Sequence, residues 1–268
     1  MLKDITLGQY FPGNSFIHRL DPRTKLICTI VYIAALFIAK SYITYGILLF
    51  ILVVSVAISR IKPMALLKGL KPLAFIIIFT AILNLFYIKG GVELWSWWVL
   101  TITTKGIETA FFMVFRIMML ICGTFLLTYT TTPMALTDGI ELLLNPFKKI
   151  HVPVHEFAMM MSIALRFIPT LIEEADKISN AQKARGADFE TGKLTERAKA
   201  LLPLLVPLFV SAFRRADELA IAMESRCYHG GEGRTRMKKL HMTTSDVVTI
   251  FASFAFLAGI IVLARFGL

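Results

Sequence analysis

Long apolar runs separated by short charged stretches set the pattern of this chain. A helix needs roughly 17–25 apolar residues to cross the bilayer core. We predict membrane spans over residues 26–39, 43–59, 73–88, 107–129 and 247–264. The first run is short, and Lys25 and Lys40 at its ends can lengthen it by snorkelling. A charged stretch before a short apolar run also fits a signal peptide, although no small-x-small cleavage motif follows it.

Residues 130–246 are too polar to be simple spans, yet they contain two apolar stretches. We predict helices over residues 131–144, 153–185 and 196–227. Pro133 suits the first turn of the short helix, whereas Pro203 and Pro207 should kink the third helix without ending it. A thirty-residue helix is about 45 Å long. Two such helices, antiparallel or crossing, would therefore form a lever.

These elements predict an all-α polytopic membrane protein with about five transmembrane helices. The predicted domains are a membrane domain over residues 1–129, a cytosolic domain over 130–246 and a last transmembrane helix over 247–268. The cytosolic domain would contain the two long crossing helices and the short helix. Whether the apolar halves of the long helices enter the bilayer stays open, and entry would raise the number of spans.

Composition and charge agree with a membrane protein. The 268 residues are 56% hydrophobic with a mean hydropathy of +0.69, which is more apolar than a soluble domain of this length. Lysines and arginines alternate across the successive loops as 4, 1, 4, 2, 16 and 1. The positive-inside rule then predicts a cytosolic N-terminus, an outer C-terminus and an outer loop holding Trp95, Trp97 and Trp98. Nucleic acid binding is disfavoured, because the basic residues adjoin spans and lack interleaved aromatics.

Two short motifs with a central arginine recur 41 residues apart. They are Ala184-Arg185-Gly186 and Ser225-Arg226-Cys227, and each ends a predicted long helix. A single arginine in the last turn is explained by the helix dipole, worth ~0.3–1 kcal/mol. Two arginines at equivalent places, each beside small residues, indicate a repeated binding tip. A guanidinium fork holds a carboxylate with two hydrogen bonds, so we predict that the tips bind two similar partners.

At these residues the sequence resembles the transmembrane T components of energy-coupling factor (ECF) transporters, the EcfT family. The hallmark of that family is a pair of three-residue motifs with a central arginine. The opening segment resembles the family too: Phe11-Pro12-Gly13-Asn14-Ser15, then His18-Arg19-Leu20-Asp21-Pro22-Arg23-Thr24-Lys25-Leu26. In that segment Asp21 can cap the first span, with Pro22 in its first turn. Cys227 stands where the second motif usually has glycine, which affects flexibility more than charge.

The resemblance implies a subunit that joins two cytosolic ABC-type ATPases (EcfA and EcfA′) to a membrane S component that binds a vitamin or metal ion. ATP-driven motion of the ATPases would move the coupling helices, and the S component would topple to release its substrate. Ala184, Arg185, Gly186, Ser225, Arg226 and Cys227 would dock the ATPases. The apolar parts of the long helices would hold the S component, through Met159, Met160, Met161, Leu165, Leu204, Leu205 and Leu208. The methionine run suits a surface that repacks, although methionines also fill ordinary cores.

On this reading the chain is a non-catalytic, multi-pass subunit of the bacterial plasma membrane. It would bind no cofactor itself, because ATP is used by the partner subunits. The sequence agrees in having no Gly-rich phosphate loop that ends in Gly-Lys-Ser/Thr. Substrate specificity would reside in another chain.

A self-contained carrier is the alternative, because Arg116 lies inside the fourth span, where a charge is costly and often functional. Arg116 would bind an anionic solute, with Asn84 as a polar companion, or would pair with a carboxylate or with backbone carbonyls inside the bundle. This alternative predicts that the chain binds solute alone.

Metal and disulfide chemistry has little support in the sequence. His151 and His155 are the only pair at ligand spacing, and a third ligand is missing. Glu173-Glu174-x-Asp176 is the only acidic cluster, and it suits a solvated helix face. Cys28, Cys122 and Cys227 have no paired spacing, and the first two suit apolar packing.

Overall fold

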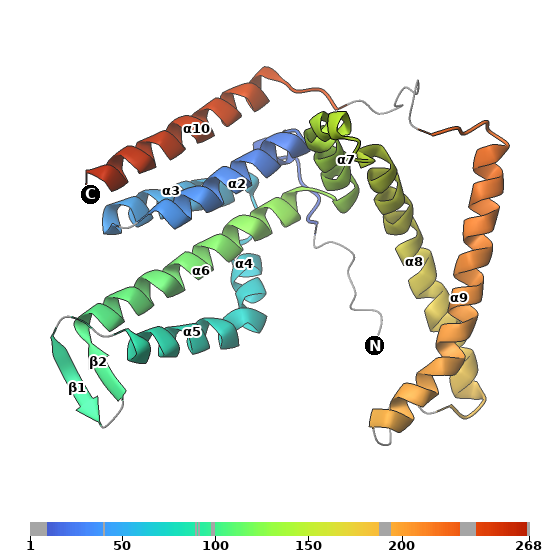
Figure 1. The fold of residues 1–268 in the computed structure, drawn as a ribbon, viewed down its shortest axis with the longest axis horizontal. Coiled ribbons are helices and arrows are strands. Elements are labelled where there is room, and N and C mark those ends of the chain that lie inside the picture. Colours follow the sequence, from blue (N-terminus) through green and yellow to red (C-terminus); the bar gives the residue numbers. More distant parts are fainter. Residues whose placement is uncertain are drawn as a thin grey trace. The chain divides into compact units, whose positions relative to one another are not determined.

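Figure 1 shows the chain in a computed structural model, which describes residues 10–39, 41–88, 90, 92–97, 100–187, 194–230 and 240–266. The described part is largely helical, with one short hairpin. In chain order the elements are α1 (Phe16–Arg19), α2 (Pro22–Ile38), α3 (Tyr42–Ser59), α4 (Pro63–Leu70), the 3₁₀ turn η2 (Lys71–Leu73), α5 (Ala74–Tyr87), β1 (Glu93–Trp97), β2 (Leu100–Thr103), α6 (Thr104–Thr130), α7 (Pro133–Leu144), η3 (Asn145–Ile150), α8 (Val154–Ala184), α9 (Leu194–Glu224) and α10 (Thr244–Arg265).

The described residues pack as two compact units. Residues 10–139 and 240–266 form one unit, called here the membrane bundle, and residues 140–187 with 194–230 form the other, called the helical arm. Helix α7 begins in the membrane bundle and ends in the helical arm. The bilayer boundaries predicted at 129/130 and 246/247 stay predictions, because packing does not locate a membrane.

The core of the membrane bundle lies where α2, α3, α6 and α10 meet. Leu36, Leu48, Met119 and Ile260, one from each of these helices, are almost fully buried and belong to one cluster. Outward-facing positions of the same bundle carry large apolar side chains, such as Phe75 at 78% exposure. Such a surface suits lipid, since a soluble monomer rarely exposes a wide apolar area. The prediction of an all-α polytopic membrane protein is confirmed.

Within the described residues, five stretches are long and apolar enough to cross a membrane, but they are not the predicted five. Tyr42–Ser59, Pro63–Tyr87, Thr104–Thr130 and Thr244–Arg265 coincide with predicted spans to within one residue or contain them. The fifth is Val154–Ala184, which is α8 and was predicted as cytosolic; its mean hydropathy, 1.2, is below that of the other four. The first predicted span corresponds to α2, whose 17 residues are at the lower limit for crossing.

Local sequence explains where several elements begin. Asp21 is the N-cap of α2, its side chain accepts from the Arg23 amide, and Pro22 follows in the first turn, as predicted. Ser41 and Thr44 form a capping box at the start of α3. The β1–β2 hairpin was not predicted. Its residues are rich in aromatic and β-branched types, which is the signal for strands.

Candidate functional site

The two arginine motifs end the two long helices of the arm. Helices α8 and α9 each contain 31 residues, run antiparallel and pack against each other, and Figure 1 shows them crossing. Pro203 and Pro207 lie inside α9, and Pro169 lies inside α8. The helices continue through these prolines, so the prediction that Pro203 and Pro207 would not end the helix is confirmed. The two crossing helices of the prediction are therefore present.

Contacts along the pair confirm the antiparallel register. Near one end, the Tyr228 hydroxyl lies 3.0 Å from the Met159 sulfur. Toward the other end, the Gln182 amide lies 3.5 Å from the Pro203 carbonyl oxygen. Because α8 and α9 run in opposite directions, the end of each helix lies beside the early part of the other.

An ion pair marks the crossing. Arg215 Nη2 lies 3.1 Å from Glu174 Oε2, and the Arg215 guanidinium stacks 5.7 Å from the ring centre of Phe167. Glu174 and Arg215 are 41 residues apart, which is also the offset between the two arginine motifs. They are therefore equivalent positions of the repeat. An approximate local two-fold rotation about this contact would exchange the two helices.

This contact corrects the interpretation of the acidic cluster. Glu173 is exposed, as a solvated helix face requires, but the Glu174 side chain is only 24% exposed and paired. Two opposite charges at equivalent repeat positions were visible in the sequence. The spacing alone did not say that the helices cross at that point.

The first arginine motif closes α8 with a Schellman cap. Arg185 is the C-cap residue, the Gly186 amide donates to Lys183 O at 3.0 Å, and the Ala187 amide donates to Gln182 O at 3.0 Å. Gly186 has φ +87°, the left-handed conformation that this cap requires and that glycine adopts without steric cost. The predicted end of this helix at Arg185 agrees with the C-cap position of that residue.

The second motif closes α9 with the same hydrogen bonds. The Cys227 amide donates to Glu224 O at 2.8 Å, and the Tyr228 amide donates to Met223 O at 3.0 Å. Arg226 therefore occupies the position of Arg185, and Cys227 occupies that of Gly186. Cys227 takes φ +55°, which costs an L-residue roughly 1–2 kcal/mol. The difference between the motifs concerns backbone strain as well as flexibility.

Both tip arginines are exposed. Within the described part of the chain, neither guanidinium has a hydrogen bond or an ion pair. Arg185 lies eleven residues beyond Glu174, and Arg226 lies eleven residues beyond Arg215. Each tip is thus about 16 Å from the crossing along its helix, at ~1.5 Å per residue. Because the helices are antiparallel, the two tips point away from the crossing in opposite directions.

The residues predicted to contact an S component divide into two groups. Met160, Met161 and Leu205 are exposed, at 53%, 53% and 43%. The others are partly covered: Met159, Leu165, Leu204 and Leu208. The prediction from the sequence did not include a more exposed apolar face of α9. This face consists of Val206, Phe209, Val210 and Phe213, each 59–69% exposed. Helical spacing was the available signal, but it did not tell which face turns toward α8.

Arg116 has a fixed structural setting in the membrane bundle. Its Nε donates to the Tyr45 hydroxyl at 2.8 Å, and its Nη2 lies 3.3 Å from the Ala39 carbonyl oxygen. The guanidinium also lies 5.8 Å from the ring centre of Phe37. Asn84 donates to Thr80 O in its own helix. The interpretation that Arg116 binds a backbone carbonyl inside the bundle is confirmed, and both residues named for the carrier alternative have hydrogen-bond partners within the chain.

One member of the histidine pair has a structural partner. His155 Nδ1 lies 3.0 Å from Glu141 Oε1, which connects α8 to α7. No group of three potential metal ligands was found among the described residues. Cys28 and Cys122 are partly buried, Cys227 is exposed, and all three are free.

Comparison with known proteins identifies the class and then the family. The fold defines the class: a helical polytopic membrane protein with a pair of long helices that each end in an arginine motif. Residues 13–237 match the family model CbiQ, described as cobalt transport protein. The chain is 54% identical over 263 residues to a protein of Ruminiclostridium cellulolyticum, with 98% of each chain covered.

Two further relatives agree. Identity is 56% over 253 residues to a protein of Thermosediminibacter oceani, covering 94% of this chain and 95% of the relative. Identity is 47% over 265 residues to a protein of Bacillus subtilis, covering 99% and 100%. All three are called energy-coupling factor transporter transmembrane protein EcfT. The chain belongs to the EcfT family, the membrane T components of ECF transporters.

Proposed function

We propose that this chain joins two cytosolic ABC-type ATPases to a membrane S component and transmits the motion that ATP drives. The observation that carries the proposal is the equivalence of the two tips. Arg185 and Arg226 are exposed, occupy the same position in the same cap, and lie eleven residues beyond the two members of the crossing pair. Two similar ATPases would each meet the same tip.

The chemistry of docking follows from the arginines. An exposed guanidinium with small neighbours can enter a cleft and hold a carboxylate through two parallel hydrogen bonds. Ala184 and Gly186 flank one arginine, and Ser225 and Cys227 flank the other. We expect each ATPase to offer an acidic groove. ATP is then bound and hydrolysed by the partners, and this chain is a non-catalytic subunit that holds no cofactor.

The apolar surface of the arm supports binding of an S component. Met160, Met161 and Leu205 stay in the proposed contact, together with the open face of α9 around Val206 and Phe209. An apolar face of this kind in water would favour association. The substrate would be a vitamin or another micronutrient, chosen by the S component.

The orientation of the chain is part of the same proposal. A cytosolic N-terminus and an outer C-terminus in a bacterial plasma membrane put the charged tips on the side where ATP is available. The alternation of lysines and arginines supports this orientation.

Co-purification tests the proposal. The full chain is expressed with its candidate ATPases and an S component and is captured by a tag on this chain. We expect both ATPases to be captured with the wild type and lost with Arg185→Glu/Arg226→Glu, because each groove would face a like charge. Arg214→Glu is the matched control, since Arg214 is exposed on α9 and lies beside the crossing. Equal capture by the double variant and the control would refute docking at the tips.

A further inference from the structure

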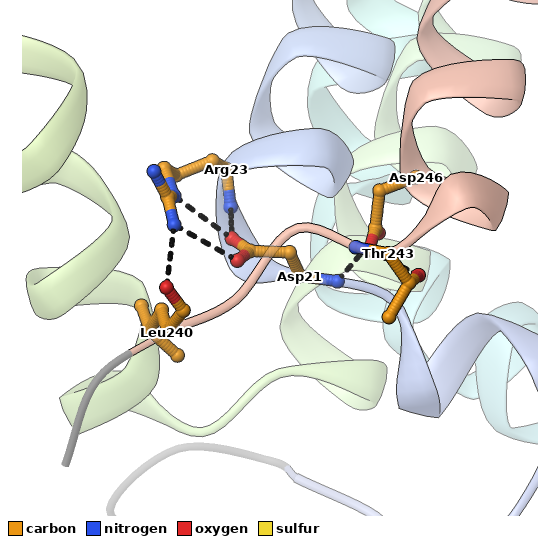
Figure 2. A network of polar contacts seen from close by, with 5 residues as sticks. All are labelled: Asp21, Arg23, Leu240, Thr243 and Asp246. Carbon is orange, nitrogen blue, oxygen red and sulfur yellow. Dashed lines mark hydrogen bonds and ion pairs between the residues drawn. The ribbon is translucent and has the colours of Figure 1, made fainter.

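Three buried charged residues cluster where α2 and α10 begin. Asp21, Lys25 and Asp246 are 6%, 7% and 1% exposed, and Figure 2 shows Asp21 and Asp246 with Arg23, Thr243 and Leu240. Burying a charge is costly, and apolar residues of similar volume often stabilise a fold as well or better. The burial of these charges therefore points to a role other than stability, in the chain segments that the three residues bind.

Arg23 and Asp246 fix the connection that returns from the helical arm. The chain re-enters the membrane bundle at Leu240. Arg23 Nη2 donates to the Leu240 carbonyl at 3.1 Å and lies 3.2 Å from Asp21 Oδ2. Asp246 accepts from the Thr243 amide at 2.8 Å and, through its other carboxylate oxygen, from the Asp21 amide at 2.8 Å. The first turn of α10 is thereby tied to the first turn of α2.

The same segment fixes the connection that leaves the bundle. Helix α6 ends at Thr130 and leads into α7. Lys25 Nζ donates to the Thr130 carbonyl at 2.9 Å, and the Phe11 amide donates to the Tyr129 carbonyl at 3.0 Å. These are carbonyls that the end of a helix leaves without a partner in the helix.

Close packing reinforces this second connection. Gly139 of α7 lies so near α2 that a Cβ there would come within 3.0 Å of Pro22 Cβ. A larger residue at 139 would require α7 or the start of α2 to shift by a few tenths of an ångström. The outgoing chain is thus held by backbone proximity as well as by the Lys25 ammonium.

We propose that Asp21, Arg23, Lys25 and Asp246 form a polar clamp that anchors both chain connections of the helical arm to the membrane bundle. These four are positioning residues: they touch no substrate and act through the connections at Thr130 and Leu240. The inference rests on the proposed function, because an arm that transmits force needs fixed attachment points. If a connection slackens, motion of the arm is absorbed there instead of reaching the bundle.

The test compares Arg23→Gln with Arg19→Gln in the complete complex with ATPases and S component, reconstituted in proteoliposomes. Arg19 is exposed in the same segment and makes no side-chain bond to another described residue. Both variants lose one positive charge, but only Arg23→Gln releases Leu240 O and Asp21. ATP hydrolysis and substrate uptake are measured together, and their ratio is the readout.

We expect Arg23→Gln to retain both ATPases and their hydrolysis while uptake per ATP falls about fivefold. Arg19→Gln should keep the wild-type ratio. Arg23→Lys keeps the charge but cannot hold Asp21 and Leu240 O in one planar fork, so its ratio should lie between the two. The inference is overturned if Arg23→Gln matches Arg19→Gln.

Two further outcomes are decided by the same samples. If Arg23→Gln does not assemble, Arg23→Lys provides the decision, and a wild-type ratio in that variant overturns the clamp. If the wild-type chain captures no ATPase, the proposed function fails first, which is distinguishable from failure of the clamp alone.

Discussion

Arginines of the membrane bundle and arginines of the helical arm are held in opposite ways. Arg116 and Arg23 direct their donors to fixed acceptors: a tyrosine hydroxyl, a carboxylate and backbone carbonyls. Arg185 and Arg226 are exposed at helix ends, without a partner in the described part of the chain. The two tip arginines thus have N–H donors without an acceptor in the described part of the chain, whereas the bundle arginines donate to acceptors within the bundle. Arginines of the first kind have acceptors within the chain, and those of the second kind are available to another protein.

The largest effect on stability is expected from replacing an arginine of the membrane bundle. Arg116→Met leaves the Ala39 carbonyl and the Tyr45 hydroxyl unpaired within the bundle. Hydrogen bonds to charged groups contribute about 1.5–3 kcal/mol, so we expect unfolding to become easier by about 2 kcal/mol. Thermal or denaturant unfolding of the purified chain in detergent measures the change.

An arm arginine supplies the contrast for that measurement. Arg166 is exposed on α8, and Arg166→Met should change stability by less than about 0.5 kcal/mol. Equal effects at Arg116 and Arg166 would remove the distinction between the two regions.

The next effect concerns the two caps. Gly186→Ala forces a Cβ into the left-handed region and should destabilise the end of α8 by about 1 kcal/mol. Nothing lies within 4 Å of the added Cβ, so the cost is conformational and not steric. Hydrogen exchange of the Gly186 and Ala187 amides should accelerate, while exchange at the α9 cap stays unchanged. Unaltered exchange at both caps would contradict the assigned geometry.

Cys227→Gly sharpens the comparison of the caps from the other side. It relieves the strain at φ +55° but adds chain entropy to the unfolded state. The two terms nearly offset, so we expect a gain of about 0.5 kcal/mol or less. Slower hydrogen exchange of the backbone amide at position 227 would show this gain in stability, and faster exchange would count against strain at that position.

A modest effect is expected at the crossing. A double-mutant cycle with Glu174→Gln and Arg215→Met should give a coupling energy of about 0.5–1 kcal/mol, because the pair is only partly shielded from solvent. Denaturant unfolding of the four proteins provides the cycle. A coupling energy of zero would mean that the pair does not hold the helices together.

The sequence was sufficient for the features that depend on long periodic patterns. Apolar runs located α3, α5, α6 and α10, and the 41-residue repeat located both arginine tips. The cap of α2 at Asp21 was predicted correctly because Asp-Pro is a strong helix start. The short elements α1, α4 and the β1–β2 hairpin were missed, since each is too brief to show a clear period.

Features that depend on three-dimensional contact were beyond the sequence. Glu174 and Arg215 were visible as charges, but their meeting depends on how α8 and α9 cross. Val206 and Phe209 were passed over because only the packing of α9 on α8 separates covered positions from open ones. Arg23 has a near partner in Asp21, but its bond to the Leu240 carbonyl depends on a contact between segments more than two hundred residues apart.

Site-specific photo-crosslinking tests most directly the claim that the two tips are equivalent docking sites. A photoreactive amino acid is placed at Ala184, at Ser225 or at Arg214, and the assembled complex is irradiated. If the tips are equivalent docking sites, positions 184 and 225 each form a crosslink to an ATPase subunit and position 214, beside the crossing, forms none. Equivalence is contradicted if neither tip crosslinks to an ATPase, or if only one of them does.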